Sequence, residues 1–175
     1  MGQTWMALAF APFLMKEGDT LALDAIYFDL DGTLVNLYGV KDWENKLRSD
    51  NPTPYKFAAP LVDMAELNDL LETAVAMGVT IGVITWLAMD SNKDYDKLVR
   101  KAKKEWLEHY VPTVSECHMV KYGTPKHYVC NIKENAVLVD DNADVREKWT
   151  RGATIDATDS DQLIEQLRSL IVENL

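Results

Sequence analysis

Five short segments rich in apolar and β-branched residues occur along the chain, and longer segments with helical spacing separate them. We expect strands at residues 23–30, 79–85, 116–120, 136–140 and 152–157. Strands that alternate with helices pair in parallel, because the helix returns the chain to the same end of the sheet. The predicted fold class is therefore α/β, a three-layer sandwich around a central parallel sheet of about five strands.

Helices are predicted between these strands. Apolar residues recur at helical spacing over 61–77, and Gly78 marks the end of that segment. A second helix follows the polar loop at 90–94 and ends before Pro112, and a last helix covers 160–172. Thr124 and Pro125 predict a further helix to about residue 132, because threonine caps helices and proline fits the first helical position.

Chain length and composition indicate one domain. The chain has 175 residues, of which 47% are hydrophobic and 26% charged, and this balance supports a single hydrophobic core. We expect residues 1–18 to form a disordered N-terminal extension and residues 19–175 to form the domain, with a small insertion at about 36–60. The apolar run at 6–15 follows no basic segment and is shorter than the ~20 residues that span a bilayer. We therefore expect neither a signal peptide nor a membrane anchor.

The net charge of −10 argues against general attraction to polyanions such as nucleic acids or anionic membranes. Basic residues nevertheless gather on the second predicted helix. They are Lys93, Lys97, Arg100, Lys101, Lys103 and Lys104. A solvated helix face is the preferred interpretation, and a docking face for nucleic acid is the alternative.

The chain has two cysteines, Cys117 and Cys130, which is too few for the disulfide framework of a small secreted domain. A reducing, cytoplasmic location is therefore expected. These cysteines together with His118 and His127 could be considered a zinc site, but their spacing is not the paired spacing of such sites. We do not favour zinc.

Polar side chains follow three of the predicted strands. Asp29 and Asp31 follow the first strand, and Thr85 closes the second. The fourth strand runs into Asp140 and Asp141, and Asp144 comes shortly after them. Since parallel sheets bind ligands at the carboxyl ends of their strands, we expect these residues to form one site.

The chemistry of that site is predicted from its carboxylates. Several carboxylates packed together repel one another unless a cation lies between them, and Mg²⁺ prefers oxygen ligands. A carboxylate beside Mg²⁺ suits attack on phosphate, for which Thr85 and a lysine would supply a hydrogen bond and a positive charge. Lys126 is the first candidate, because we expect it at a helix N-terminus, and Lys121 is the second.

With these residues the chain resembles the haloacid dehalogenase-like (HAD) superfamily of phosphohydrolases, over roughly residues 24–157. The segments that carry the resemblance are Asp29-Leu30-Asp31-Gly32-Thr33, Val83-Ile84-Thr85 and Val137-Leu138-Val139-Asp140-Asp141. The family also has a lone lysine, for which Lys126 and Lys121 both remain candidates. The resemblance implies a Rossmann-like sheet with a small cap or none, the cap being the insertion at 36–60.

The resemblance also implies roles for single residues. Asp29 would attack phosphorus and form an aspartyl-phosphate, which water then hydrolyses. Asp31 would protonate the leaving oxygen and later deprotonate water, and this acid separates phosphatases from the dehalogenases and transport ATPases of the superfamily. The backbone carbonyl of Asp31 and the side chains of Asp29 and Asp140 or Asp141 would hold Mg²⁺, with Asp144 as a further candidate.

Substrate choice is predicted less sharply. The remaining candidate substrate-binding residues are Leu30, Gly32, Thr33, Trp86 and Lys121. The aromatic residues Tyr38, Trp43, Tyr55 and Trp86 could stack on a base, so a nucleotide or another small phosphometabolite is the leading substrate class. The alternatives are a phosphatase of polynucleotide ends, a regulatory protein that binds phosphate or metal without turnover, and a phosphoacceptor of the receiver kind.

Overall fold

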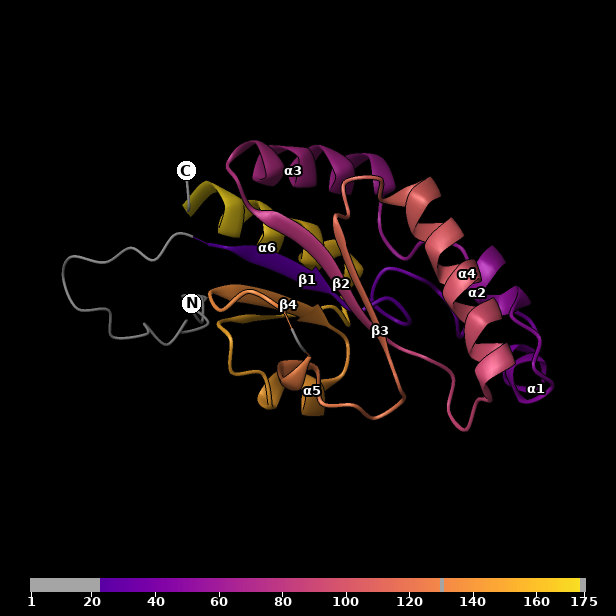
Figure 1. Cartoon of the computed structure of the whole chain (residues 1–175). Coiled ribbons are helices and arrows are strands. Elements are labelled where there is room, and N and C mark those ends of the chain that lie inside the picture. The colour runs from indigo at the N-terminus through magenta and orange to yellow at the C-terminus, as the bar shows by residue number, and fades with distance from the viewer. Residues whose placement is uncertain (1–22, 130, 174–175) are drawn as a thin grey trace, which may run out of the picture.

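The structure, a computed structural model, describes residues 23–129 and 131–173. The predicted N-terminal extension at 1–18 and Cys130 lie outside the described residues. In the described part, five parallel strands form one sheet in the order β3-β2-β1-β4-β5 (Figure 1). The strands are β1 (Ala25–Phe28), β2 (Thr80–Trp86), β3 (Glu116–Val120), β4 (Ala136–Asp140) and β5 (Thr154–Asp156). This is the predicted α/β class with a Rossmann-like arrangement.

Helices connect the strands and flank the sheet. They are α1 (Trp43–Arg48), α2 (Thr53–Phe57), α3 (Met64–Ala76), α4 (Lys93–Tyr110), α5 (Ala143–Glu147) and α6 (Ser160–Glu173), together with the 3₁₀ turn η1 (Lys126–Tyr128). In Figure 1, α3 and α6 lie on one side of the sheet and α5 lies on the other. The sheet is therefore the middle layer of three.

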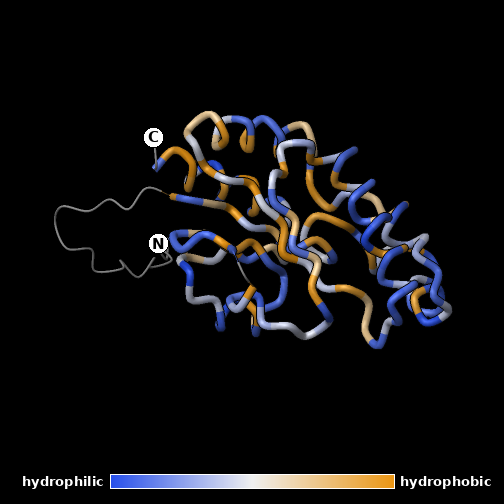
Figure 2. The backbone as a smooth tube through the Cα atoms, viewed as in Figure 1, coloured by the Kyte–Doolittle hydropathy of each residue, from blue (hydrophilic) through white to orange (hydrophobic). Residues whose placement is uncertain are grey.

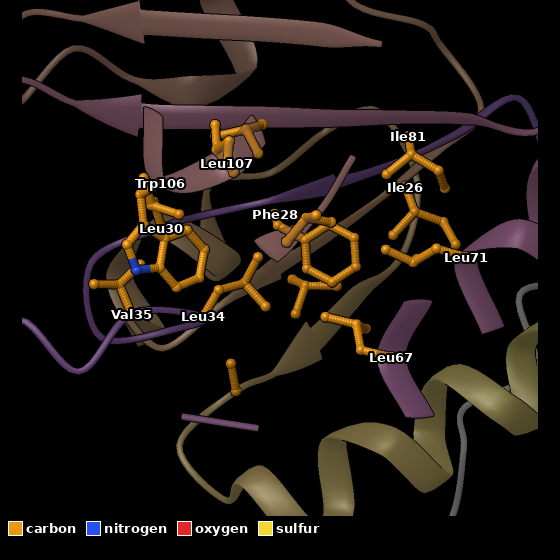
Figure 3. Packing of buried hydrophobic residues seen from close by; sticks show 14 of the residues in the cluster. Ile26, Phe28, Leu30, Leu34, Val35, Leu67, Leu71, Ile81, Trp106 and Leu107 are labelled. Carbon is orange, nitrogen blue, oxygen red and sulfur yellow. The ribbon is translucent and has the colours of Figure 1, made fainter. Parts of the chain in front are cut away.

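Residues of the central strands point to opposite faces of the sheet, where they belong to two separate hydrophobic clusters. Ile26 and Phe28 belong to the larger cluster, which also contains buried residues of α3, α4 and α6. Figure 3 shows these two side chains facing Leu67 and Leu71 of α3. Tyr27, between them in sequence, points into the smaller cluster on the opposite face. Burial on both faces explains why β1 is apolar throughout and why parallel pairing was predictable.

Two helix starts show how local sequence sets the elements. The carboxylate of Asp63 accepts hydrogen bonds from the backbone N–H groups of Ala65 and Glu66, so α3 begins at Met64 rather than at the predicted residue 61. Asn92 caps α4 in the same way. Gly78, with φ +89°, follows the end of α3 as predicted.

The predicted helix after Thr124 and Pro125 is wrong. Among the described residues of this segment only the three-residue turn η1 forms, and the residues on either side of it, Pro125 and Val129, have extended backbone with ψ 122° and 131°. In the sheet β1 and β2 separate β3 from β4, so the connection must cross two strands. Extended chain covers more than twice the distance per residue that a helix does, which explains the difference.

The insertion at 36–60 forms α1 and α2, which lie beside α4 at one end of the sheet (Figure 1). Tyr55 of α2 is buried, and the indole N–H of Trp106 in α4 donates to the carbonyl of Ala58 at 2.9 Å. These contacts pack the insertion against α4. Figure 2 shows hydrophobic residues concentrated along the central strands and hydrophilic residues on the outer side of α4.

None of the helices in the described part combines the length and the apolar character that a bilayer crossing requires.

Candidate functional site

Three carboxylates meet at the carboxyl end of the sheet. Asp29 follows β1, Asp140 is the last residue of β4, and Asp141 comes directly after it. One oxygen from each of the three lies within 4.8 Å of the others. The parallel pairing of β1 with β4 brings them together, because Phe28 is in register with Val139 and the N–H of Asp29 donates to the carbonyl of Val139 at 2.8 Å.

Lys126 supplies the positive charge of this cluster. Its ammonium lies 2.5 Å from Asp29 Oδ1 and 2.6 Å from Asp140 Oδ2, and its side chain is buried. Burial opposes the charged form, but the two carboxylates outweigh it and raise the pKa of Lys126. The other candidate, Lys121, is exposed and is not among the residues that line the cavity at this site. Although η1 is not an α-helix, the structure brings the first of the two predicted lysines to Asp29.

The turn after β1 fits closely against Asp141. Gly32 has φ +90°, and a Cβ atom there would lie 2.6 Å from Asp141 Oδ2. The hydroxyl of Thr33 accepts the backbone N–H of Asp141 at 3.1 Å and lies 3.3 Å from its Oδ1. The side chain of Leu30 lies in the hydrophobic core rather than in the site, while its carbonyl accepts the N–H of Val35 at 2.9 Å. The turn therefore aligns Asp141 with Asp29.

Asp31 lies beside a lysine that the sequence interpretation did not assign to the site. Lys103 of α4 places its ammonium 2.5 Å from Asp31 Oδ2 and 2.8 Å from the hydroxyl oxygen of Thr85, and its side chain is fully buried. It also donates to the carbonyl of Trp86 at 2.7 Å. Thr85 is itself buried, as expected for the end of the central strand β2.

The basic residues of the second predicted helix, α4, were interpreted as a solvated face, and this interpretation is wrong for Lys103. The other basic residues there are exposed, and three of them pair with acids on the same helix: Lys97 with Asp94, Lys101 with Glu105 and Lys104 with Glu108. A sequence signal was available, since Lys103 follows Val99 by four residues and so shares the apolar stripe of α4 with Trp106.

The electrostatic environment raises the pKa of three carboxyl groups at this site. Burial raises the pKa of Asp31, against the opposing effect of Lys103, and the charge of Asp29 raises it further. Burial also raises the pKa of Asp140 to about 6, because Lys126 is shared with Asp29 and offsets only part of this effect. The pKa of Asp141 is raised by burial and by Asp29. The cluster thus carries more carboxylates than its cation offsets.

A cavity of about 320 Å³ opens over these residues. Asp29, Asp31 and Lys126 lie in its wall, and the insertion contributes Tyr38, Trp43 and Tyr55 among others. The rings of Tyr38 and Trp43 lie 5.1 Å apart, centroid to centroid. The cavity therefore joins a charged floor to a rim that includes aromatic rings.

Trp86 and Tyr122 form another part of that rim, with ring centroids 5.1 Å apart. The indole N–H of Trp86 donates to the carbonyl of Thr124 at 2.8 Å, and the Lys126 ammonium lies 5.5 Å from the centre of the Trp86 ring. Trp86 therefore contacts the cavity and also holds the segment that carries Lys126.

Asp144 was a predicted metal ligand, whereas the zinc set was considered but not favoured. Asp144 is exposed in the first turn of α5 and does not belong to the carboxylate cluster. Of the residues considered for zinc, Cys117, His118 and His127 form no metal-binding group within the described part of the chain.

The arrangement suits a hard cation with an anion beside it. Asp29, Asp140 and Asp141 offer oxygen ligands at a common point, which suits a divalent cation such as Mg²⁺. Lys126, which lies in the cavity wall, can interact with an anion beside that cation. Neither a protein-family model nor a curated protein sequence matches the chain significantly.

Proposed function

We propose that this chain is a Mg²⁺-dependent phosphatase of the HAD-like kind, with Asp29 as the nucleophile. The observation that carries the proposal is the junction of Asp29, Asp140 and Asp141, whose oxygens lie within 4.8 Å of one another with Lys126 bonded to the first two. Asp31, two residues after Asp29, lies in the same cavity wall and has a raised pKa. A turn that contains acidic residues but has no catalytic role would not explain why three carboxylates and a lysine meet at one point.

The residues present fit a divalent cation. The cluster holds three carboxylates and one ammonium, so a cation would relieve the remaining repulsion. Asp29, Asp140 and Asp141 would hold Mg²⁺, which when bound offsets the repulsion between a carboxylate nucleophile and phosphoryl oxygens.

The reaction uses two carboxyl groups in succession. An oxygen of Asp29 attacks phosphorus and forms an aspartyl-phosphate, while Asp31 gives its proton to the oxygen of the departing alcohol. Asp31 then takes a proton from the water that attacks the aspartyl-phosphate, which releases phosphate and restores Asp29. Lys126 compensates charge on the phosphoryl oxygens during both steps, and the Thr85 hydroxyl donates a hydrogen bond to one of them. The raised pKa of Asp31 fits its role as an acid.

We further propose that the insertion at 36–60 is a small cap and that the substrate is a nucleotide or another small phosphometabolite. A cavity of about 320 Å³ lies at the lower end of the range for small-molecule sites. Its aromatic rim, with Tyr38, Trp43 and Trp86, suits a planar base. Pairing of three of the exposed lysines of α4 with acids on the same helix weighs against docking of polynucleotide ends.

Phosphate release tests this proposal. The wild-type protein and Asp29→Asn are assayed against 5′- and 3′-nucleotides, sugar phosphates and phosphorylated DNA ends, with Mg²⁺ and with EDTA. We expect Mg²⁺-dependent release from a nucleotide by the wild type and none by the variant. Preference for DNA ends would favour the polynucleotide phosphatase, whereas folded wild-type protein that binds Mg²⁺ but releases no phosphate would contradict the enzyme and favour a binding protein.

A further inference from the structure

Lys103 has a hydrogen-bond acceptor for each hydrogen of its buried ammonium. An ammonium has three hydrogens to donate, and Lys103 has three acceptors. These are Asp31 Oδ2 at 2.5 Å, Thr85 Oγ1 at 2.8 Å and the carbonyl of Trp86 at 2.7 Å. With its side chain 0% exposed, the ammonium is fixed in one position.

The acceptors of Lys103 come from separate parts of the fold. Asp31 belongs to the turn after β1, while Thr85 and Trp86 end β2, and Lys103 itself comes from α4. The ammonium also lies 4.8 Å from the centre of the ring of Tyr55, which belongs to the insertion. One buried cation therefore connects the turn that follows Asp29, the end of β2 and the insertion.

These contacts leave one specific atom of Asp31 without a hydrogen-bond partner. Its Oδ2 is occupied by Lys103, whereas its Oδ1 is buried and has no hydrogen-bond partner among the described residues. An unpartnered buried carboxyl oxygen is unfavourable in the free protein. Because Asp31 also lines the cavity, a group of the substrate is the candidate partner for this oxygen. Likewise, Thr85 accepts from Lys103, which leaves its hydroxyl hydrogen for another acceptor.

We propose that Lys103 is a positioning residue that orients Asp31 Oδ1 toward the leaving-group oxygen and the Thr85 hydroxyl toward the phosphoryl group. This inference rests on the proposed phosphatase. Lys103 touches neither phosphorus nor the leaving group, and it acts only through Asp31 and Thr85. The contribution through Asp31 depends on the leaving group, because an alkoxide needs a proton as the P–O bond breaks and a nitrophenolate does not.

The test compares Lys103→Met with wild type on an alkyl phosphate and on p-nitrophenyl phosphate, with Mg²⁺ present. We expect kcat/KM to fall at least about tenfold more for the alkyl phosphate than for p-nitrophenyl phosphate. Lys104→Met is the matched control, since Lys104 is the adjacent residue but its side chain is 72% exposed, and it should leave both rates unchanged.

The double variant Asp31→Asn, Lys103→Met removes both charges of the buried pair, so it covers the case in which Lys103→Met does not fold. Relative to Asp31→Asn, kcat/KM of the double variant should fall by the same factor on both substrates, because no acid remains to be oriented. Equal losses on both substrates in Lys103→Met, or a further selective loss of alkyl phosphate in the double variant, would overturn the inference. If the wild type and Lys104→Met release no phosphate, the proposed phosphatase function is wrong, and the positioning role of Lys103 is wrong with it.

Discussion

At the scale of single residues, Asp140 and Asp29 share one buried ammonium. Lys126 lies 2.6 Å from Asp140 and 2.5 Å from Asp29, so neither carboxylate has the cation to itself. Because burial outweighs this shared attraction, the pKa of Asp140 is raised to about 6 in the folded protein. The unfolded chain has the ordinary value near 3.8.

The sign of the resulting pH effect follows from linkage. Between about pH 4 and pH 6 the folded state binds more protons at Asp140 than the unfolded state does, so stability falls as pH rises through this range. We predict that, in EDTA, the stability of Asp140→Asn relative to wild type increases as pH rises through this range, by roughly 2 kcal/mol in total. Urea unfolding at several pH values measures the difference. A difference that stays constant or shrinks would contradict the shift.

Gly32 combines a left-handed backbone with close packing. Gly32→Ala would place its Cβ 2.6 Å from Asp141 Oδ2, so we predict a loss of stability and of Mg²⁺ affinity. Gly78→Ala is the matched control, because Gly78 has φ +89° but no atom within 4 Å of the added Cβ. The control should lose about 1–2 kcal/mol from strain alone and retain Mg²⁺ binding. Equal effects of the two substitutions on Mg²⁺ binding would show that contact with Asp141 is unimportant.

Much of the charged cluster was predictable from sequence, and the reason is local. Asp29, Asp140 and Asp141 each follow an apolar strand, and parallel pairing brings strand ends together whatever the details of the loops. Lys103 was missed because its neighbours Lys101 and Lys104 are exposed, and the group of charges concealed its place on the apolar stripe of α4. Its pairing with Asp31 is a tertiary contact between residues 72 positions apart.

At the scale of elements, the connection from β3 to β4 holds Lys126 without an α-helix. The turn η1 has three residues, and the bond from the indole N–H of Trp86 to the carbonyl of Thr124, at 2.8 Å, fastens the segment before it. Thr124 and Pro125 have the residue types of a helix start, but the need to cross two strands overrides this preference. The longer helices, α3, α4 and α6, were predictable because their apolar periodicity is sustained over several turns.

We predict that Trp86→Phe lowers kcat about tenfold, because the segment carrying Lys126 loses its attachment. The control is Trp149→Phe, which removes an equivalent bond, 3.0 Å long, from the indole N–H to the carbonyl of Ala136. Both substitutions should lower the free energy of unfolding by about 1–2 kcal/mol. Steady-state kinetics with thermal melts separates the two effects. Equal kcat values for both variants would contradict a role for Trp86 in holding Lys126.

At the scale of the whole molecule, the carboxylate cluster joins β1 and β4, so a bound cation should stabilise the fold. We predict that Mg²⁺ at about 100 times its Kd adds about 2.7 kcal/mol of stability and raises Tm. Asp141→Asn should lose most of this shift, whereas Asp144→Asn should keep it, because Asp144 is exposed outside the cluster. Differential scanning calorimetry with and without Mg²⁺ measures the shifts. Loss of the Mg²⁺-induced shift in Tm in Asp144→Asn would show that the cation binds outside the carboxylate cluster.

If Asp29 takes the phosphoryl group from the substrate, the covalent intermediate can be trapped on this residue. The wild-type protein is mixed with its best substrate and Mg²⁺, quenched in acid within milliseconds, and digested for mass spectrometry. We predict one phosphoryl group on the peptide that contains Asp29, and none in Asp29→Asn. Phosphate release by the wild type with no labelled peptide, or with the phosphoryl group on another residue, would show that Asp29 is not the nucleophile.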